Sequence, residues 1–301
     1  MEKLDRLGWA AGISFRAYGV RVGIRTTTPD VLPLIYPLLP PGWKPLSRPI
    51  VDYLYSFVVG GRGPASIRHF HIVYSGAVRL ARTTDLSQAL RLLELDLHFY
   101  VAERARYRVF VHAGVVGWQG RAIVIPGRTW SGKTSLVRSL VEAGASYYSD
   151  EFAVFDASGR VHPYPIALGI RDEHSGLPRK YSIAELGGTV GSRPLPVELI
   201  VFTQFQPGAR WRPQLLTPGR TVLELLRHTL PARREPERVL KTLSVVASHA
   251  TALKGDRGEA RDLAVGLLEW LSRLKTCSPG AKKLVSSELL ARSGRSSSLS
   301  P

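Results

Sequence analysis

Residues 122–135 read AIVIPGRTWSGKTS and constrain the fold more than any other stretch of the chain. The continuous apolar run Ala122–Ile125 predicts a buried strand, and the residues from Lys133 onward have the spacing of an amphipathic helix. Between them lies the pattern G-x-x-x-x-G-K-[ST], with Gly127 and Gly132 as its glycines. At an average glycine usage of about 7%, a random chain of this length would match the pattern on the order of once in a hundred times. A strand joined to a helix by such a loop is a unit of α/β folds.

The residue types in this glycine loop (residues 127–134) are those that hold phosphate groups. Glycines let successive backbone N–H groups turn toward phosphate oxygens, and the N-terminus of the following helix adds its dipole. Lys133 is expected to reach the β- and γ-phosphates, and the Thr134 hydroxyl is expected to ligate Mg²⁺. The sequence therefore predicts a site for ATP and Mg²⁺. The residues expected to bind the nucleotide are Gly127, Arg128, Thr129, Trp130, Ser131, Gly132, Lys133, Thr134 and Ser135.

Two adjacent acids, Asp150 and Glu151, follow the predicted helix in the stretch YYSDEFAVF. They precede an apolar run, whereas the acid that positions Mg²⁺ in most P-loop proteins ends a buried strand. His112 lies in another apolar run, VHAGVV, 15 residues before Gly127, and Asp150 lies 23 residues after Gly127. The two acids and the histidine are therefore candidates for completing the phosphate site.

Together, these three segments resemble the catalytic domain of the HPr kinase/phosphorylase family, a P-loop fold related to phosphoenolpyruvate carboxykinase. The resemblance covers about residues 109–171. It is closest to the HPr-kinase-related proteins of uncertain substrate, some of which modify serines on small ribosomal peptides. It implies an α/β fold in which a P-loop catalytic domain of this type follows a small N-terminal α/β domain. The family's second glycine-rich signature has no good counterpart in this sequence, so HPr itself is not the expected acceptor.

The resemblance also implies roles for individual residues. Asp150 matches the family's first acid, which implies a general base that takes the proton from a substrate hydroxyl. Glu151 matches the second acid, where the family usually has Asp, and is implied to hold Mg²⁺ together with Thr134. His112 and Lys133 are implied to lie beside the transferred phosphoryl group, where an imidazolium would stabilise charge or relay a proton.

Structural interpretations of the same residues stay open. Acids at the start of a strand are often solvated or cap the backbone, and a histidine between apolar neighbours is often a hydrogen-bonded core residue. Arg171 follows the apolar stretch IALGI and is either a phosphate clamp or a surface charge. The glycine loop could itself be a structural turn with a surface lysine.

Changes in pattern along the chain predict three parts. Residues 1–106 read as a small α/β domain that ends in a long helix with Asp85 as its N-cap, and by analogy this domain is expected to recognise the acceptor. Residues 107–275 form the P-loop domain. Residues 276–301 form a basic, serine-rich tail that is expected to be disordered.

Helical spacing returns after the apolar stretch VELIVFTQF, residues 197–205. Thr221 begins a TVLE sequence that fits a capping box. Pro236 is a candidate start of a further helix and Gly255 a candidate end for it. A last helix is expected near residues 259–274.

The chain carries a formal net charge of +17, from 41 basic and 24 acidic residues. The basic residues are scattered rather than clustered with aromatic residues, so a nucleic-acid partner is not expected. No apolar run reaches the roughly 20 residues that a membrane-spanning helix needs, and the first residues lack the apolar region of a signal peptide. With Cys277 as its single cysteine, the chain cannot form an internal disulfide. We therefore expect a cytoplasmic protein.

These observations lead to one preferred function and several alternatives. We expect an ATP- and Mg²⁺-dependent kinase that transfers the γ-phosphate to a hydroxyl group, preferably a serine of a protein or peptide. A small-molecule kinase would need the same residues. A nucleotide-gated ATPase or binding protein would use the same loop without transferring phosphate. Relatives form oligomers, so self-association is a further open point.

Overall fold

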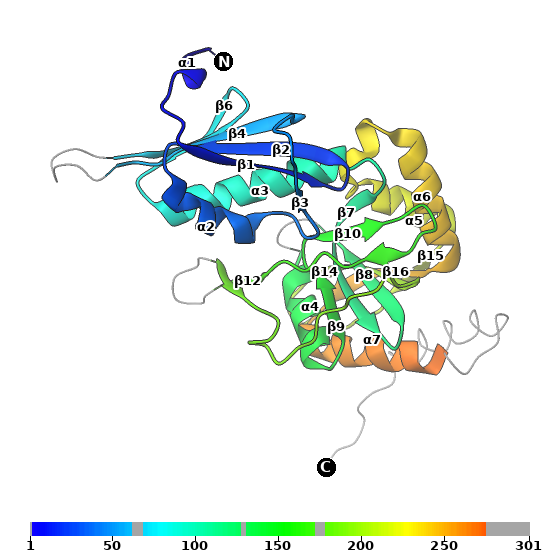
Figure 1. Ribbon diagram of the computed structural model, residues 1–301. Helices are drawn as coiled ribbons and strands as arrows, with labels where there is room; N and C mark the ends of the chain where they lie inside the picture. Colours follow the sequence, from blue (N-terminus) through cyan, green and yellow to red (C-terminus); the bar gives the residue numbers. More distant parts are fainter. Residues whose placement is uncertain (1, 62–68, 128–130, 172–177, 275–301) are drawn as a thin grey trace. The chain divides into compact units, whose positions relative to one another are not determined.

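Each part of the chain consists of a β-sheet with helices packed on it, so the protein is of the mixed α/β class, as the sequence predicts (Figure 1). The computed structural model describes residues 2–61, 69–127, 131–171 and 178–274. The chain divides into two units, Met1–Tyr107 and Arg108–Pro301. Within the described ranges, no helix is long and apolar enough to cross a membrane.

A six-stranded sheet, in the order β3-β1-β2-β4-β5-β6, forms the N-terminal unit. Its first hairpin turns at Tyr18 and Gly19, which both adopt positive φ (50° and 84°). A two-residue turn of this kind suits the right-handed twist of paired antiparallel strands. The strands are β1 (Ala11–Ala17), β2 (Val20–Thr26), β3 (Lys44–Pro45), β4 (Tyr53–Val58), β5 (His71–Ser75) and β6 (Val78–Thr83).

The long helix α3 (Leu86–Arg104) covers one face of this sheet. Its N-cap is Asp85, as the sequence predicts, and the Asp85 carboxylate accepts hydrogen bonds from two backbone N–H groups of the first turn. Leu93 and Leu97 of α3 join a core cluster with Phe15 and other strand residues. The short helices of this unit are α1 (Glu2–Asp5), η1 (Pro29–Val31), α2 (Leu32–Ile35) and η2 (Tyr36–Leu38).

The main sheet of the C-terminal unit follows the order β11-β10-β7-β8-β14-β16-β15, and β9 pairs with β7 outside this path. Strands β8, β14 and β16 run parallel, so their carboxyl ends meet at one edge of the sheet, where ligands of α/β proteins usually bind. The strands are β7 (Val109–Trp118), β8 (Arg121–Pro126), β9 (Ser146–Ser149), β10 (Phe152–Phe155), β11 (Val161–His162), β14 (Val197–Phe205), β15 (Gln214–Leu216) and β16 (Thr251–Arg257). A separate two-stranded sheet pairs β12 (Leu168–Arg171) with β13 (Pro178–Tyr181).

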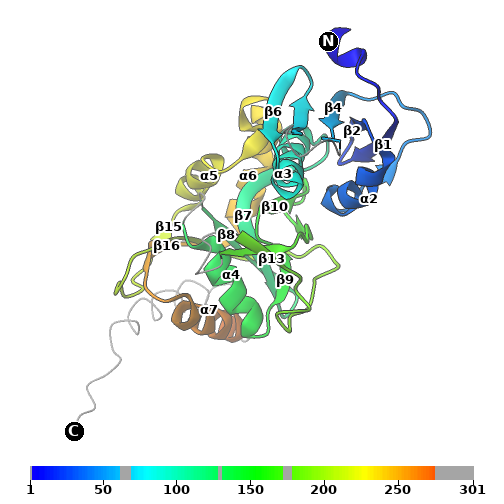
Figure 2. The same ribbon diagram turned by 90° about the vertical axis from the view of Figure 1, so that its left-hand side faces the viewer.

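Helices cover both faces of this sheet (Figure 2). On one face, α4 and α7 contribute Leu136 and Trp270 to a buried cluster that includes β8 and β14 residues. On the other face, α5 and α6 contribute Leu225 and Leu243 to a second buried cluster. The helices are α4 (Lys133–Glu142), α5 (Pro218–Leu226), η3 (Leu230–Arg233), α6 (Pro236–His249) and α7 (Ala260–Leu274).

Two expectations about the later elements are wrong. Helix α5 begins at Pro218 with Thr217 as its N-cap, so Thr221 lies inside the helix, where its hydroxyl donates to the Thr217 carbonyl (2.9 Å). Helix α6 does begin at Pro236, but it ends at His249, and Gly255 lies within strand β16. Strand β16 forms because β14 and β15 pair with it on either side, which local sequence does not reveal. The predicted tail, residues 276–301, lies outside the described residues.

Candidate functional site

Strand β7 brings the candidate site residues together. Its first half pairs with β10 and its second half with β8, and His112 lies at the junction. The glycine loop leaves the sheet at this point, because the Gly127 N–H donates to the His112 carbonyl (3.3 Å). On the other side of β7, Asp150 and Glu151 connect β9 to β10, and both of these strands pair with β7. The loop and the acid pair therefore flank the same few residues of one strand.

Lys133, the first residue of α4, is buried beneath the loop. Its Nζ donates to the Gly127 carbonyl (3.2 Å) and lies 3.1 Å from His112 Nε2. Burial lowers the pKa of Lys133, and the nearby charges of Asp150 and Glu151 partly offset this by raising it. A phosphate group in the loop would supply the anionic partner that stabilises a buried ammonium group.

Asp150 contacts the threonine of the glycine loop. Thr134 Oγ1 donates to Asp150 Oδ2 (2.9 Å), whereas Oδ1 is buried and has no hydrogen-bond partner among the residues that the structure describes. Burial raises the pKa of Asp150 to about 6, and the bond from Thr134 and the charge of Lys133 partly offset the rise. A buried carboxylate oxygen of this kind is an acceptor position for a cation, a water or a substrate hydroxyl.

Glu151 lies beside the histidine. Its Oε1 is 3.3 Å from His112 Nε2. The turn that carries both acids is fixed by Ser149, whose hydroxyl accepts hydrogen bonds from the backbone N–H groups of Glu151 (3.2 Å) and Phe152 (2.9 Å). The Glu151 side chain is 29% exposed, so it reaches solvent, whereas Asp150 is enclosed.

Thr134, Asp150 and Glu151 fit a hard divalent cation such as Mg²⁺. The fit rests on the enclosed Asp150 Oδ1, which lies in the same carboxylate that accepts the Thr134 hydroxyl. Mg²⁺ prefers oxygen ligands, keeps several waters and takes other ligands from substrate phosphates. In the described part of the chain, no three His, Cys, Asp or Glu side chains form a metal-binding group. Waters and phosphate oxygens would complete the coordination of such a cation.

The expected site residues differ in what the structure shows of them. Gly132 is the N-cap of α4 and adopts the left-handed conformation (φ +80°), which favours glycine. Ser131 lies within the glycine loop, directly before the N-cap Gly132, and Ser135 is exposed on α4. The expected residues Arg128, Thr129 and Trp130 lie outside the described residues, as does the side chain of Arg171. The residues that come together are His112, Lys133, Thr134, Asp150 and Glu151.

Sequence reasoning missed Arg257, which ends strand β16 beneath the glycine loop. Its guanidinium donates to the Gly132 carbonyl (2.7 Å) and to the Gly258 carbonyl (2.8 Å). The side chain is 2% exposed, and burial lowers its pKa while the charge of Glu259 partly offsets this. It carries no ion pair with a carboxylate in the described ranges. No local motif marks this arginine, because its role depends on where β16 lies in the sheet.

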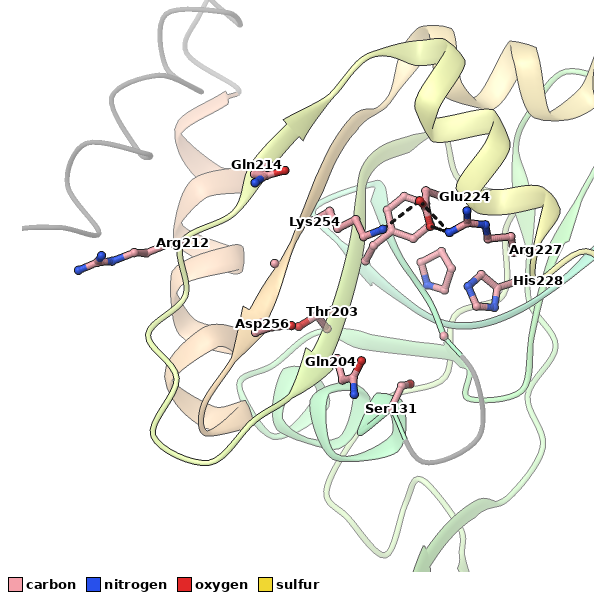
Figure 3. A pocket seen from close by; sticks show the side chains of 14 residues that line it. Ser131, Thr203, Gln204, Arg212, Gln214, Glu224, Arg227, His228, Lys254 and Asp256 are labelled. Atoms are coloured by element: carbon pink, nitrogen blue, oxygen red, sulfur yellow. Dashed lines mark hydrogen bonds and ion pairs between the residues drawn. The ribbon is translucent and has the colours of Figure 1, made fainter.

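A cavity of about 780 Å³ opens beside the glycine loop, between the sheet and the end of α5 (Figure 3). Gly127 and Ser131 form its border with the loop. Its remaining walls come from β8, β14, β15, β16 and α5, and from the segments just before β15 and just after α5. Figure 3 shows Lys254 and Arg227 in contact with Glu224 at one end of the cavity. The volume lies within the range of about 300–1,000 Å³ that is typical of small-molecule sites.

In comparisons with known proteins, no family model matches this chain and no curated protein shows significant similarity to it. A buried lysine and a helix N-terminus can bind phosphate, and two carboxylates and an imidazole can position a metal and move a proton.

Proposed function

We propose that this protein is an ATP-dependent kinase, with a P-loop domain of the HPr kinase and phosphoenolpyruvate carboxykinase type. It transfers the γ-phosphate to a hydroxyl group, preferably a serine of a protein or peptide. The main support is that Lys133 and Thr134 of the glycine loop contact His112 (3.1 Å) and Asp150 (2.9 Å). A glycine loop alone indicates nucleotide binding. Carboxylates and an imidazole at the loop add the acid–base groups that transfer requires.

In the proposed step, the acceptor oxygen forms a bond to the γ-phosphorus while the bond from that phosphorus to the bridging oxygen of ADP breaks. The hydroxyl proton passes to a carboxylate of the acid pair, and ADP leaves with the electron pair of the broken bond. Lys133 stabilises the negative charge on the phosphate oxygens. Mg²⁺ held by Thr134 and an acid would supply further charge stabilisation there.

The contacts are compatible with two assignments of the general base and the metal ligand to Asp150 and Glu151. In the first, which the family resemblance implies, Asp150 takes the proton, and its pKa of about 6 suits a general base near neutral pH. In the second, Asp150 and Thr134 hold the metal, and Glu151, which is in contact with His112, takes the proton. We propose the second, because the loop threonine and a nearby aspartate are the usual pair that holds Mg²⁺ in P-loop proteins.

The test follows the γ-phosphate. Purified protein, γ-labelled ATP and Mg²⁺ would be mixed with a desalted extract of the source cells and, separately, with its small-molecule fraction. We expect label on one acceptor, and none with Lys133→Ala, because the main point charge of the loop is gone. Glu151→Gln should keep ATP binding and lose transfer by about 100-fold or more. Glu142→Gln, an exposed acid of α4, serves as the control and should behave as the wild type.

Two results would count against this proposal. Label released only as inorganic phosphate, in amounts that neither Glu151→Gln nor Asp150→Asn changes, would favour a nucleotide-gated ATPase without phosphotransfer. The second result concerns the general base. If Asp150→Asn lost transfer fully but kept Mg²⁺-dependent ATP binding, and Glu151→Gln stayed active, Asp150 would be the general base.

A further inference from the structure

The cavity beside the glycine loop has a definite position relative to the acids. His112, Asp150 and Glu151 lie on the β7 and β10 side of β8. The cavity lies on the opposite side of β8, where β14 and β16 continue the sheet. Gly127 and Ser131 belong to both the glycine loop and the cavity wall, so the cavity borders the loop.

A bound triphosphate would have to run across the loop in one direction. In the proposed function, the terminal phosphate lies where Lys133 and Thr134 meet His112 and Asp150. The other end of the phosphate chain then points away from the acids, toward the cavity. The acceptor hydroxyl attacks in line from the side opposite ADP, so it approaches from the acid side. The cavity is therefore on the nucleoside side of the reaction.

The strand register explains how the cavity wall is composed. Phe202 of β14 lies opposite Lys254 of β16, and Gln204 lies opposite Asp256, so these four side chains point to the same face of the sheet. Phe202 is 5% exposed and belongs to the second buried cluster, so it contributes an apolar part of the cavity wall. Gln204 offers both a donor and an acceptor to its edge. The exposed carboxylate of Asp256 lies near the loop border of this wall.

The charges of the cavity are not equally available to a ligand. Glu224 accepts from Lys254 (2.9 Å) and Arg227 (3.1 Å), and the bond from Lys254 lowers the pKa of Glu224. These three residues close the far end as an ion-paired cluster. Arg212 points away from the cavity in Figure 3. Asp256 has no hydrogen bond or ion pair within the described part of the chain, and a carboxylate accepts readily from two adjacent hydroxyls.

We propose that this cavity binds the ribonucleoside part of the nucleotide, with Asp256 accepting hydrogen bonds from the ribose hydroxyls. The ligand class is a ribonucleoside triphosphate whose base lies against Phe202 and Gln204. This inference rests on the proposed function, because the direction of the triphosphate is taken from it. An acidic side chain that binds the ribose diol is a general solution for nucleotide sites.

The test compares three ligands by calorimetry on the full chain with Mg²⁺: ATP, 2′-deoxy-ATP and inorganic tripolyphosphate. Tripolyphosphate reports on the glycine loop alone, and the difference between ATP and tripolyphosphate reports on the cavity. We expect wild type to bind ATP at least tenfold more tightly than tripolyphosphate. Wild type should also bind ATP more tightly than 2′-deoxy-ATP, which lacks one ribose hydroxyl. Asp256→Ala should weaken ATP binding about tenfold and change the affinity for tripolyphosphate by less than twofold. It should also bind ATP and 2′-deoxy-ATP equally.

Two further variants sharpen the test. Asp262→Ala replaces an exposed acid of α7 that does not line the cavity and should leave all three affinities unchanged. Gln204→Trp fills part of the cavity and should weaken the binding of ATP but not that of tripolyphosphate.

Equal binding of ATP and tripolyphosphate by wild type would overturn the inference and leave the kinase proposal standing. An Asp256→Ala effect on the acceptor KM alone would overturn it in favour of an acceptor site. Failure of wild type to bind either ligand would overturn both proposals.

Discussion

His112 has two polar contacts at the same nitrogen. Its Nε2 lies 3.1 Å from Lys133 Nζ and 3.3 Å from Glu151 Oε1. A protonated lysine donates to an unprotonated Nε2, whereas contact with a carboxylate requires a proton on Nε2, so the two contacts exclude one another as hydrogen bonds. A phosphate that draws Lys133 toward the loop would free Nε2 to donate to Glu151. In the proposed function, nucleotide binding would in this way favour the contact between His112 and Glu151.

Asp150 should make stability depend on pH in an identifiable way. Its pKa is raised by burial from 3.8 to about 6, so the folded state binds a proton more tightly than the unfolded state. By linkage, this group lowers the free energy of unfolding as pH rises from about 4 through 6, and its effect is constant above that. Asp150→Asn should therefore gain stability relative to wild type between pH 4 and pH 7. Urea denaturation of both proteins across this range measures the difference, and a difference independent of pH would contradict the prediction.

Arg257 should matter for nucleotide binding although it lies outside the glycine loop. Arg257→Met keeps most of the apolar stem but leaves the carbonyls of Gly132 and Gly258 without the guanidinium and removes a buried cation beside the loop. We expect ATP affinity to fall about tenfold, as for the loss of a charged hydrogen bond. Arg257→Lys should recover only part, because one ammonium group cannot match the guanidinium fork. Calorimetry measures both variants, and full ATP affinity in a folded Arg257→Met protein would refute this role.

The elements differ in how far local sequence predicts them. The β8–loop–α4 unit is predictable because its apolar strand, glycines and amphipathic helix are contiguous. The acid pair is also predictable, because Asp150 and Glu151 follow at a recognisable spacing. Strand β16 is not, because its exposed and buried residues make sense only between β14 and β15. Arg257, which donates to the Gly132 carbonyl, and Asp256, which lines the cavity, both belong to that strand. Their positions beside the glycine loop therefore cannot be predicted from local sequence.

The start of helix α5 is another feature that local sequence does not predict correctly. Both Thr217 and Thr221 are chemically suitable N-caps. The structure selects Thr217, which has extended backbone and accepts from the Arg220 N–H, and Pro218 then occupies the first helical position. The sequence TVLE at Thr221 does match a capping box. Packing of α5 over the sheet nevertheless places that threonine inside the helix, where it is 1% exposed.

Contact between β7 and α4 should be sensitive to a single methyl group. A Cβ added at Gly114 would overlap Val137 of α4, whose β-branched side chain has little freedom to move. Gly114→Ala should therefore lower the free energy of unfolding by about 1–3 kcal/mol. Gly266→Ala on the exposed face of α7, where nothing lies within 4 Å, is the matched control. It should raise stability by about 0.5–1 kcal/mol. Equal effects of the two substitutions on urea denaturation would contradict this packing argument.

Across the whole chain, the residues of the candidate site belong to one of the two units. The glycine loop, the acid pair and the cavity wall all lie within Arg108–Pro301. The N-terminal unit has its own sheet and its own buried cluster around Phe15, Tyr55 and Leu97. This buried cluster contains residues of the N-terminal unit alone. If the proposed function holds, we expect this separately folded unit to recognise the acceptor.

Separating the two units tests this division of roles. A fragment of residues 108–301 keeps both buried clusters of the C-terminal unit, so we expect it to fold and to bind ATP within about threefold of the full chain. It should lose transfer to the natural acceptor, because the recognising unit is gone, while slow hydrolysis of ATP persists. Circular dichroism checks folding, calorimetry measures ATP binding, and γ-phosphate tracing measures transfer. A folded fragment that phosphorylates the acceptor with an unchanged KM would show that the N-terminal unit does not recognise it. A folded fragment that fails to bind ATP would mean that the nucleotide site needs residues from both units.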